Sequence, residues 1–242
     1  MRLIVEPRKA GETARDYAYA VIRKNLADMT LEPGSTLNDM EIAAQLGISR
    51  TPVREAINQL KGESEIIEIY PQRGMKVALI DIDVIRNVRL MRMLIEKEMV
   101  RRCCGQAAVE DISWLEENLA LQYFYYGRRE LQKTIELDNR LHRKLYEIPG
   151  YDYIYRSTRG PMIHYDRVRV LEAFYDTYRE SIDDHAAMIR AIKERDPAEA
   201  CRMMEIHLDR WLVNEQRLRA EYPHYFKKEG IEDEGSQNYE AG

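Results

Sequence analysis

Apolar residues recur at helical spacing along most of the chain. The first stripe consists of Tyr17, Val21, Ile22, Leu26 and Met29. A Pro33-Gly34 pair closes it, since both residues interrupt helices. A short helix over about 38–46 and a third over about 49–61 are predicted next. Ser49 is a favourable N-cap for that third helix.

Strand-like alternation is confined to one stretch of the chain, between residues 66 and 79. Two β-rich runs, 66–70 and 75–79, flank a turn that contains Gly74. Such an arrangement predicts a β-hairpin.

From Asp81 onward the spacing of apolar residues is helical again. The predicted helices cover about 81–104, 110–126, 130–148, 151–176, 179–195 and 197–220. The Gly160-Pro161 pair is expected to kink or restart the fourth of them, because proline removes a backbone donor.

This order of elements predicts a mostly α protein with two domains. Residues 10–80 form an N-terminal winged helix-turn-helix, and residues 81–222 form an all-α six-helix bundle that acts as an effector domain. Residues 223–242 are expected to be a disordered tail, because the segment from Lys227 onward has five acidic residues and no apolar period.

Composition narrows the classes of function. The 37 basic and 42 acidic residues give a formal charge of −5, which excludes a wholly basic nucleic-acid coat but allows a small basic reading surface. The longest stretch without a charge, residues 118–127, is too short to cross a membrane. Three cysteines, two of them adjacent, form no disulfide framework, so a cytoplasmic protein is expected.

The third predicted helix carries the candidate DNA-reading residues. In a helix-turn-helix the second helix enters the major groove with its N-terminal residues at base edges. Here those residues are Arg50, Thr51 and Arg54, and the two arginines share one helix face. At the hairpin tip, Arg73 and Gly74 suit a narrow groove or phosphates.

The alternative is that the two arginines belong to an ordinary solvated face. Residues 8–80 carry ten basic and ten acidic side chains, so any basic surface is local. Useful affinity for double-stranded operator DNA would then require a homodimer.

Three sequence blocks resemble the GntR family of bacterial transcription regulators over roughly residues 12–80. They are Leu31 to Leu37 (LEPGSTL), Ile42 to Ala56 (IAAQLGISRTPVREA) and Gln72 to Val77 (QRGMKV). The resemblance implies that Arg50 and Arg54 contact bases and phosphates and that Gly74 is the wing tip. Met40 departs from the pattern, since some members have a DNA-contacting arginine there, and the glycine before the wing strand is displaced within residues 61–65.

A second group of residues predicts a metal site. Asp138 and His142 are four residues apart on one helix face, and His185 and His207 lie within the apolar stripes of two later helices. A buried carboxylate is costly unless it is paired or coordinated, and one cation would satisfy all four groups. One carboxylate and three imidazoles suit Zn²⁺, Ni²⁺, Mn²⁺ or Fe²⁺ better than Ca²⁺. Alternatively, each histidine is a hydrogen-bonded core residue, since spacing alone does not show that the helices converge.

The helical half also resembles the FCD effector domain of the FadR subfamily, over about residues 82–220. The matching positions are Asp138-x-x-x-His142, Asp184-His185 and Met204-x-x-His207. The resemblance implies a divalent transition metal at the base of a cavity for small organic acids. Arg92 matches an arginine that could pair with the acid's carboxylate, and Arg167 and Arg169 are further candidates.

These features predict a transcription regulator, not an enzyme, that binds operator DNA as a homodimer under the control of a small organic acid. Two alternatives share the metal site. In one the metal itself is the signal. In the other the chain is a metal-dependent hydrolase, which would need a general base beside the metal.

Overall fold

The computed structural model describes residues 2–173 and 178–228, apart from the side chain of Val213. Its N-terminal unit contains three helices, α1 (Ala14–Ala27), α2 (Asp39–Leu46) and α3 (Arg50–Ser64). Local chemistry sets their ends. The side chain of Asn38 accepts from the first backbone amides of α2, and Gly47, with φ of 65°, ends that helix.

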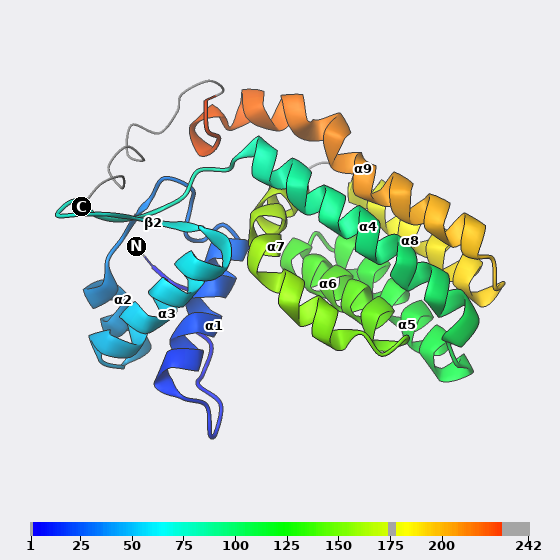
Figure 1. Ribbon diagram of the computed structural model, residues 1–242, viewed down its shortest axis with the longest axis horizontal. Helices are drawn as coiled ribbons and strands as arrows, with labels where there is room; N and C mark the ends of the chain where they lie inside the picture. Colours follow the sequence, from blue (N-terminus) through cyan, green and yellow to red (C-terminus); the bar gives the residue numbers. More distant parts are fainter. Residues whose placement is uncertain (1, 174–177, 229–242) are drawn as a thin grey trace, which may run out of the picture.

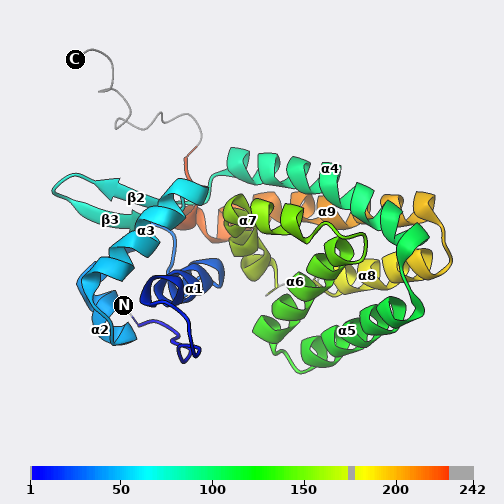
Figure 2. The ribbon, with the colours of Figure 1, turned by 60° about the horizontal axis from the view of Figure 1, so that its bottom comes forward.

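A small antiparallel sheet completes this unit. Its strands are β1 (Thr36–Leu37), β2 (Ile67–Tyr70) and β3 (Gly74–Val77), in the order β1-β3-β2. The predicted hairpin is present, with Tyr70 opposite Gly74, and it projects beyond α3 as a wing (Figure 2). Strand β1 was not predicted, because two residues are too few to show an alternating pattern.

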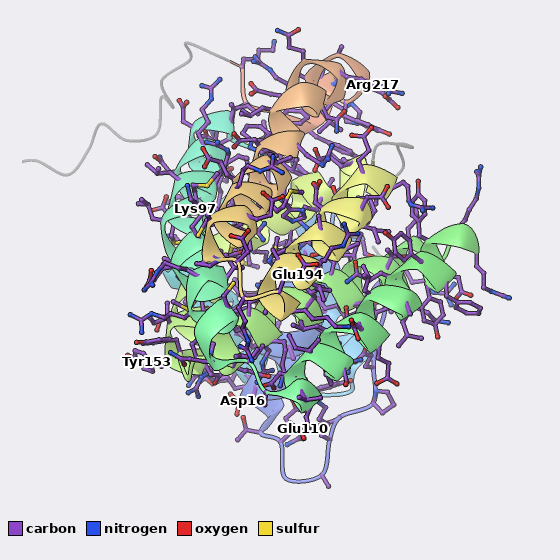
Figure 3. The ribbon with its side chains drawn as sticks, turned by 90° about the vertical axis from the view of Figure 1, so that its right-hand side faces the viewer. Asp16, Lys97, Glu110, Tyr153, Glu194 and Arg217 are labelled. Carbon is purple, nitrogen blue, oxygen red and sulfur yellow. The ribbon has the colours of Figure 1, made fainter. Side chains whose placement is uncertain are left out.

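The described part of the second unit is entirely helical, as predicted. Its six helices are α4 (Ile82–Gln106), α5 (Val109–Gly127), α6 (Leu131–Glu147), α7 (Asp152–Glu172), α8 (Tyr178–Lys193) and α9 (Pro197–Glu221). The two long helices α4 and α9 lie side by side over the bundle (Figures 1 and 2). An exposed ion pair joins them, with Lys97 Nζ 2.7 Å from Glu205 Oε2, and Lys97 is labelled at the surface in Figure 3. Within the described residues, no helix is long and apolar enough to span a bilayer.

Helix α7 lies between the winged helix and the rest of the bundle (Figure 1). The helix runs through Pro161 without restarting, so that part of the prediction was wrong. The neighbouring Gly160 has a packing role, because a Cβ at that position would lie 2.7 Å from the backbone oxygen of Glu63. Residues 174–176 of the predicted fourth helix lie outside the described residues.

The start of the predicted tail is packed against the fold. Residues Pro223–Tyr225 form a 3-10 turn, and Phe226 forms a parallel bridge with Ile80. The buried aromatic ring of Phe226 explains the difference from the expected disorder over residues 223–228. Residues 229–242 lie outside the described part of the chain.

Candidate DNA-reading surface and metal centre

The predicted reading residues Arg50, Thr51 and Arg54 all lie exposed at the start of α3. One carboxylate, Asp39 at the start of α2, holds both arginines. Its oxygens accept from Arg50 Nη2 at 3.0 and 3.1 Å, and Arg54 Nε lies 2.8 Å away. Burial alone would raise the pKa of Asp39. The hydrogen bonds and charges of Arg50 and Arg54 lower it by a larger amount, so the pKa lies below its ordinary value and the carboxyl stays ionised.

An open groove of about 660 Å³ separates this face of α3 from the wing. Arg73 and Gly74 are exposed at the hairpin tip, as expected. The backbone of Gly74 has φ of 93°, a conformation that favours glycine. Met40, which replaces the arginine of some GntR regulators, is 54% exposed.

Three helices bring the predicted histidines together. His142 comes from α6, His185 from α8 and His207 from α9, and one ring nitrogen of each lies within 4.8 Å of the others. The Nε2 atoms of His142 and His207 are 3.2 Å apart. Two nitrogens bound to one ion at about 2.0–2.1 Å lie about 2.8–3.4 Å apart in octahedral or tetrahedral geometry. The cluster therefore has the spacing of a metal site.

Neighbouring side chains orient two of these rings. His185 Nδ1 donates to Gln122 Oε1 at 2.9 Å, and His142 Nδ1 lies 2.8 Å from Glu96 Oε2. His185 Nε2 is left without a hydrogen-bond partner among the described residues, whereas His142 Nε2 lies 3.2 Å from His207 Nε2 and 3.3 Å from Arg92 Nη2. Burial lowers the pKa of both imidazoles, which keeps them in the neutral form that a metal requires.

Asp138 lies beside the three rings. Its Oδ1 is 3.3 Å from His142 Nε2 and 2.6 Å from Arg169 Nη2, and its Oδ2 accepts from Tyr178 at 3.0 Å. Burial raises the pKa of this carboxyl, but the charge of Arg169 holds it well below its ordinary value. The three predicted histidines thus lie in one cluster, and Asp138, ionised and held by Arg169, contacts that cluster through His142.

A small cavity of about 10 Å³ adjoins the cluster, with room for about one water molecule. Its lining includes Arg92, Arg159, Arg169 and His142, with Glu96 as the carboxylate. Arg92 is buried and binds Glu96 through two hydrogen bonds of 2.8 and 3.2 Å.

Arg167, predicted to contact the same acid, lies elsewhere. It donates to the backbone oxygen of Ala78 at 2.6 Å and approaches His164 Nδ1 at 3.0 Å. These contacts belong to the join between the two units, and the described cavity lining excludes Arg167. Its position depends on how the units dock, which the spacing of residues within α7 does not show.

Sequence reasoning missed the residues that support the cluster. Glu96, Gln122, Tyr178 and Arg159 each contact a predicted site residue or line the cavity. The spacing of Arg92 and Glu96, four residues apart on one helix, was a signal for the first of them.

Comparison with known proteins gives matches to both units. A family model described as FCD domain matches residues 87–210, and one for bacterial regulatory proteins of the gntR family matches residues 14–77. The HTH-type transcriptional repressor RspR of Escherichia coli K12 is 28% identical over 212 residues, covering 87% of this chain and 92% of that protein. A transcriptional regulator from an unstable DNA locus of Streptomyces ambofaciens is 26% identical over 220 residues, covering 89% and 91%.

Solved structures match in fold. The Escherichia coli protein McbR/YncC aligns with a TM-score of 0.75 at 17% identity, covering 87% of this chain and 99% of that one. A GntR regulator from Rhodococcus sp. RHA1 aligns with a TM-score of 0.68 at 18% identity, covering 88% and 99%.

Proposed function

The chain belongs to the GntR family of bacterial transcription regulators, in the group with an FCD domain, and we propose that a small organic acid bound beside a metal controls its binding to operator DNA in the cytoplasm. The observation that carries the proposal is the buried cluster of three imidazoles. Three imidazole nitrogens within 4.8 Å of one another, with a carboxylate beside them, match Zn²⁺, Ni²⁺, Mn²⁺ or Fe²⁺.

In this proposal His142, His185 and His207 hold the metal, and Asp138 is the fourth ligand. With four protein ligands, an ion that accepts five or six ligands would keep a position for an oxygen of the acid. Gln122 and Glu96 hold the rings of His185 and His142, which would keep their Nε2 atoms directed at the ion.

The charge of the cavity supports an acidic effector. Arg92, Arg159 and Arg169 line it together with a single carboxylate, Glu96. A planar guanidinium binds a carboxylate through two parallel hydrogen bonds. We assign carboxylate binding to Arg92 and Arg169 first, because both lie within the same cavity as His142.

For the N-terminal unit, we propose that Arg50, Thr51 and Arg54 read base edges and phosphates in the major groove, while Arg73 and Gly74 approach the adjacent groove. The exposure of these residues supports this assignment. The neutral charge balance of residues 8–80 supports a homodimer on an inverted repeat, since one unit offers few phosphate contacts.

The small volume of the cavity favours a second candidate, in which the metal alone is the signal. A hydrolase is disfavoured because the carboxylates beside the rings are already engaged. Glu96 binds Arg92 and His142, and Asp138 binds Arg169 and Tyr178. Neither is thus placed as a general base.

Metal analysis and thermal melting test the proposal. The chain, purified without chelator, should contain a transition metal, and added Zn²⁺ should raise its melting temperature by mass action. His185→Ala should abolish both effects, while His224→Ala, at an exposed histidine, should leave them intact. A metal-free chain that no added ion stabilises would overturn the metal site. A screen of organic acids against the Zn²⁺-loaded chain then separates an acid effector from metal sensing.

A further inference from the structure

A chain of ion pairs leads from the histidine cluster to the winged helix. Arg169 binds two carboxylates, with Nη2 at 2.6 Å from Asp138 and Nη1 at 3.4 Å from Asp166. Asp166 in turn lies 3.2 Å from Arg159 and 3.7 Å from Arg23, which belongs to α1 of the DNA-reading unit. Charged groups therefore connect the metal centre to α1 without interruption.

Most of the side chains in this series of ion pairs are buried. The side chain of Asp166 is 4% exposed and that of Arg169 is 7% exposed, while Arg23 is 17% exposed. Buried charges depend on their partners, because an unpaired ion in a low-dielectric site is strongly disfavoured. If one ion pair in this series changes partner, the neighbouring ion pair must therefore change to compensate.

Helix α7, which carries Asp166 and Arg169, also contacts the base of the wing. His164 Nε2 donates to the backbone oxygen of Ser64, at the end of α3, and Arg167 donates to that of Ala78, just after β3. Arg159 also touches both units, since its guanidinium lines the cavity and its backbone oxygen accepts from Arg23 Nη2 at 3.0 Å. Helix α7 thus contacts the effector cavity and the DNA-reading unit at once.

We propose that Asp166 is the relay through which the metal and effector site controls the DNA-reading unit. The inference rests on the proposed function, because it needs a ligand to bind at the histidine cluster. Asp166 is one negative charge shared by Arg23, Arg159 and Arg169. A bound cation would compete with Arg169 for Asp138, and Arg169 would then draw more strongly on Asp166. The hold of Asp166 on Arg23 would weaken, which would allow α1 to shift against α7.

An effector carboxylate acts on the same arginines. Arg159 and Arg169 both line the cavity, so an acid bound there competes with Asp166 for their guanidinium groups. Coupling of this kind requires an element with two discrete arrangements. In this proposal the two arrangements are Asp166 bound mainly to Arg23 and Asp166 bound mainly to Arg159 and Arg169.

The experiment compares operator affinity with and without Zn²⁺, using a DNA duplex selected from random sequences by the wild-type chain. In the wild type, saturating Zn²⁺ should change the affinity at least about fivefold, the lower range of allosteric coupling. Asp166→Asn should bring this ratio close to one while it binds the same amount of Zn²⁺. Arg23→Gln should have the same effect, and Arg23→Lys should restore part of the response.

A matched control pair crosses the same join without touching the cavity. Glu136 of α6 lies 3.4 Å from Lys24 of α1 and is mostly exposed, so Glu136→Gln should keep the wild-type ratio. If Asp166→Asn and Arg23→Gln fold, bind Zn²⁺ and keep the full ratio, the relay is overturned and the proposed function stands. If the wild type binds Zn²⁺ and its operator affinity changes neither with Zn²⁺ alone nor with an acid that stabilises the Zn²⁺-loaded chain, the proposed function fails and the relay fails with it. If only such an acid changes the affinity, the same variants are compared with and without that acid.

Discussion

Two clusters in this molecule pair arginine with aspartate, and they differ mainly in their exposure to solvent. In the winged helix, Asp39 holds Arg50 and Arg54, whose side chains are 50% and 66% exposed. In the helical unit, Asp138 holds Arg169, which is only 7% exposed. Exposed guanidinium groups can exchange an aspartate for a phosphate or a base edge at low cost, whereas buried ones cannot lose a partner without a replacement. The first arrangement suits reading DNA, and the second suits sensing a ligand.

The largest expected effect is on stability, and it should separate the two clusters when the carboxylate of each is removed. Asp138→Asn should lower the free energy of unfolding by about 3–5 kcal/mol, because it leaves Arg169 buried without its closest partner. Asp39→Asn should cost less than about 1 kcal/mol, since Arg50 and Arg54 turn to water. Urea denaturation of the metal-free chain measures both, and equal losses would show that burial does not distinguish the clusters.

The reading arginines should behave in the opposite way. Arg50→Ala or Arg54→Ala should weaken operator binding by about 1–3 kcal/mol if each reads a base. Stability and Zn²⁺ binding should not change, because both side chains are exposed. Arg86→Ala is the matched control, since Arg86 is 53% exposed on α4. Unchanged affinity and sequence preference in both α3 variants would contradict the assignment.

The join between the units gives a prediction of intermediate size. Gly160→Ala should destabilise the chain by about 1–3 kcal/mol, because its Cβ would clash with the backbone of Glu63. Gly62→Ala, also within a helix but with open space around it, should instead stabilise by about 0.4–1 kcal/mol. Equal effects in thermal melting would mean that α7 does not press against α3.

Particular residues show how far sequence reasoning reached. The starts of α2, α3 and α9 were predicted to within one residue, because helical spacing and helix-breaking residues are local in sequence. Ser49 occupies the predicted N-cap position of α3, although its side chain forms no capping hydrogen bond. Each of the three histidines was placed on an apolar helix face, but spacing alone left their convergence open, and the structure brings them together. The partner of Arg167 and the close approach at Gly160 were not predictable, because both depend on how two separately folded units meet.

The smallest effect is a dependence of stability on pH that should be confined to the helical unit. Burial lowers the pKa of His142 and His185 below their ordinary value, so the folded chain disfavours their protonation. The stabilisation that depends on these two imidazoles being neutral is complete above about pH 6.5, the pKa of histidine in the unfolded chain. It is lost as the pH falls below that value. Residues 2–80 contain no histidine. His164 of the helical unit, which contacts the end of α3 and whose pKa burial lowers to about 4, should add to this loss at the join.

Glu172 opposes this trend and can be removed. Burial raises its pKa to about 7, so its proton stabilises the fold at low pH and that contribution is lost as the pH rises through about 7. In metal-free Glu172→Gln, the urea midpoint should therefore fall more steeply between pH 7.5 and about 5.5 than in the wild type. A flat profile in both proteins would contradict the assigned protonation states of the histidines.

Operator affinity of the full chain, measured by fluorescence anisotropy with saturating Zn²⁺ and again with chelator, tests the central claim most directly. We expect the two wild-type affinities to differ at least about fivefold, and those of His185→Ala to coincide. Identical wild-type affinities, both with Zn²⁺ alone and with every acid that raises the melting temperature of the Zn²⁺-loaded chain, would contradict the account that the buried cluster controls the exposed one.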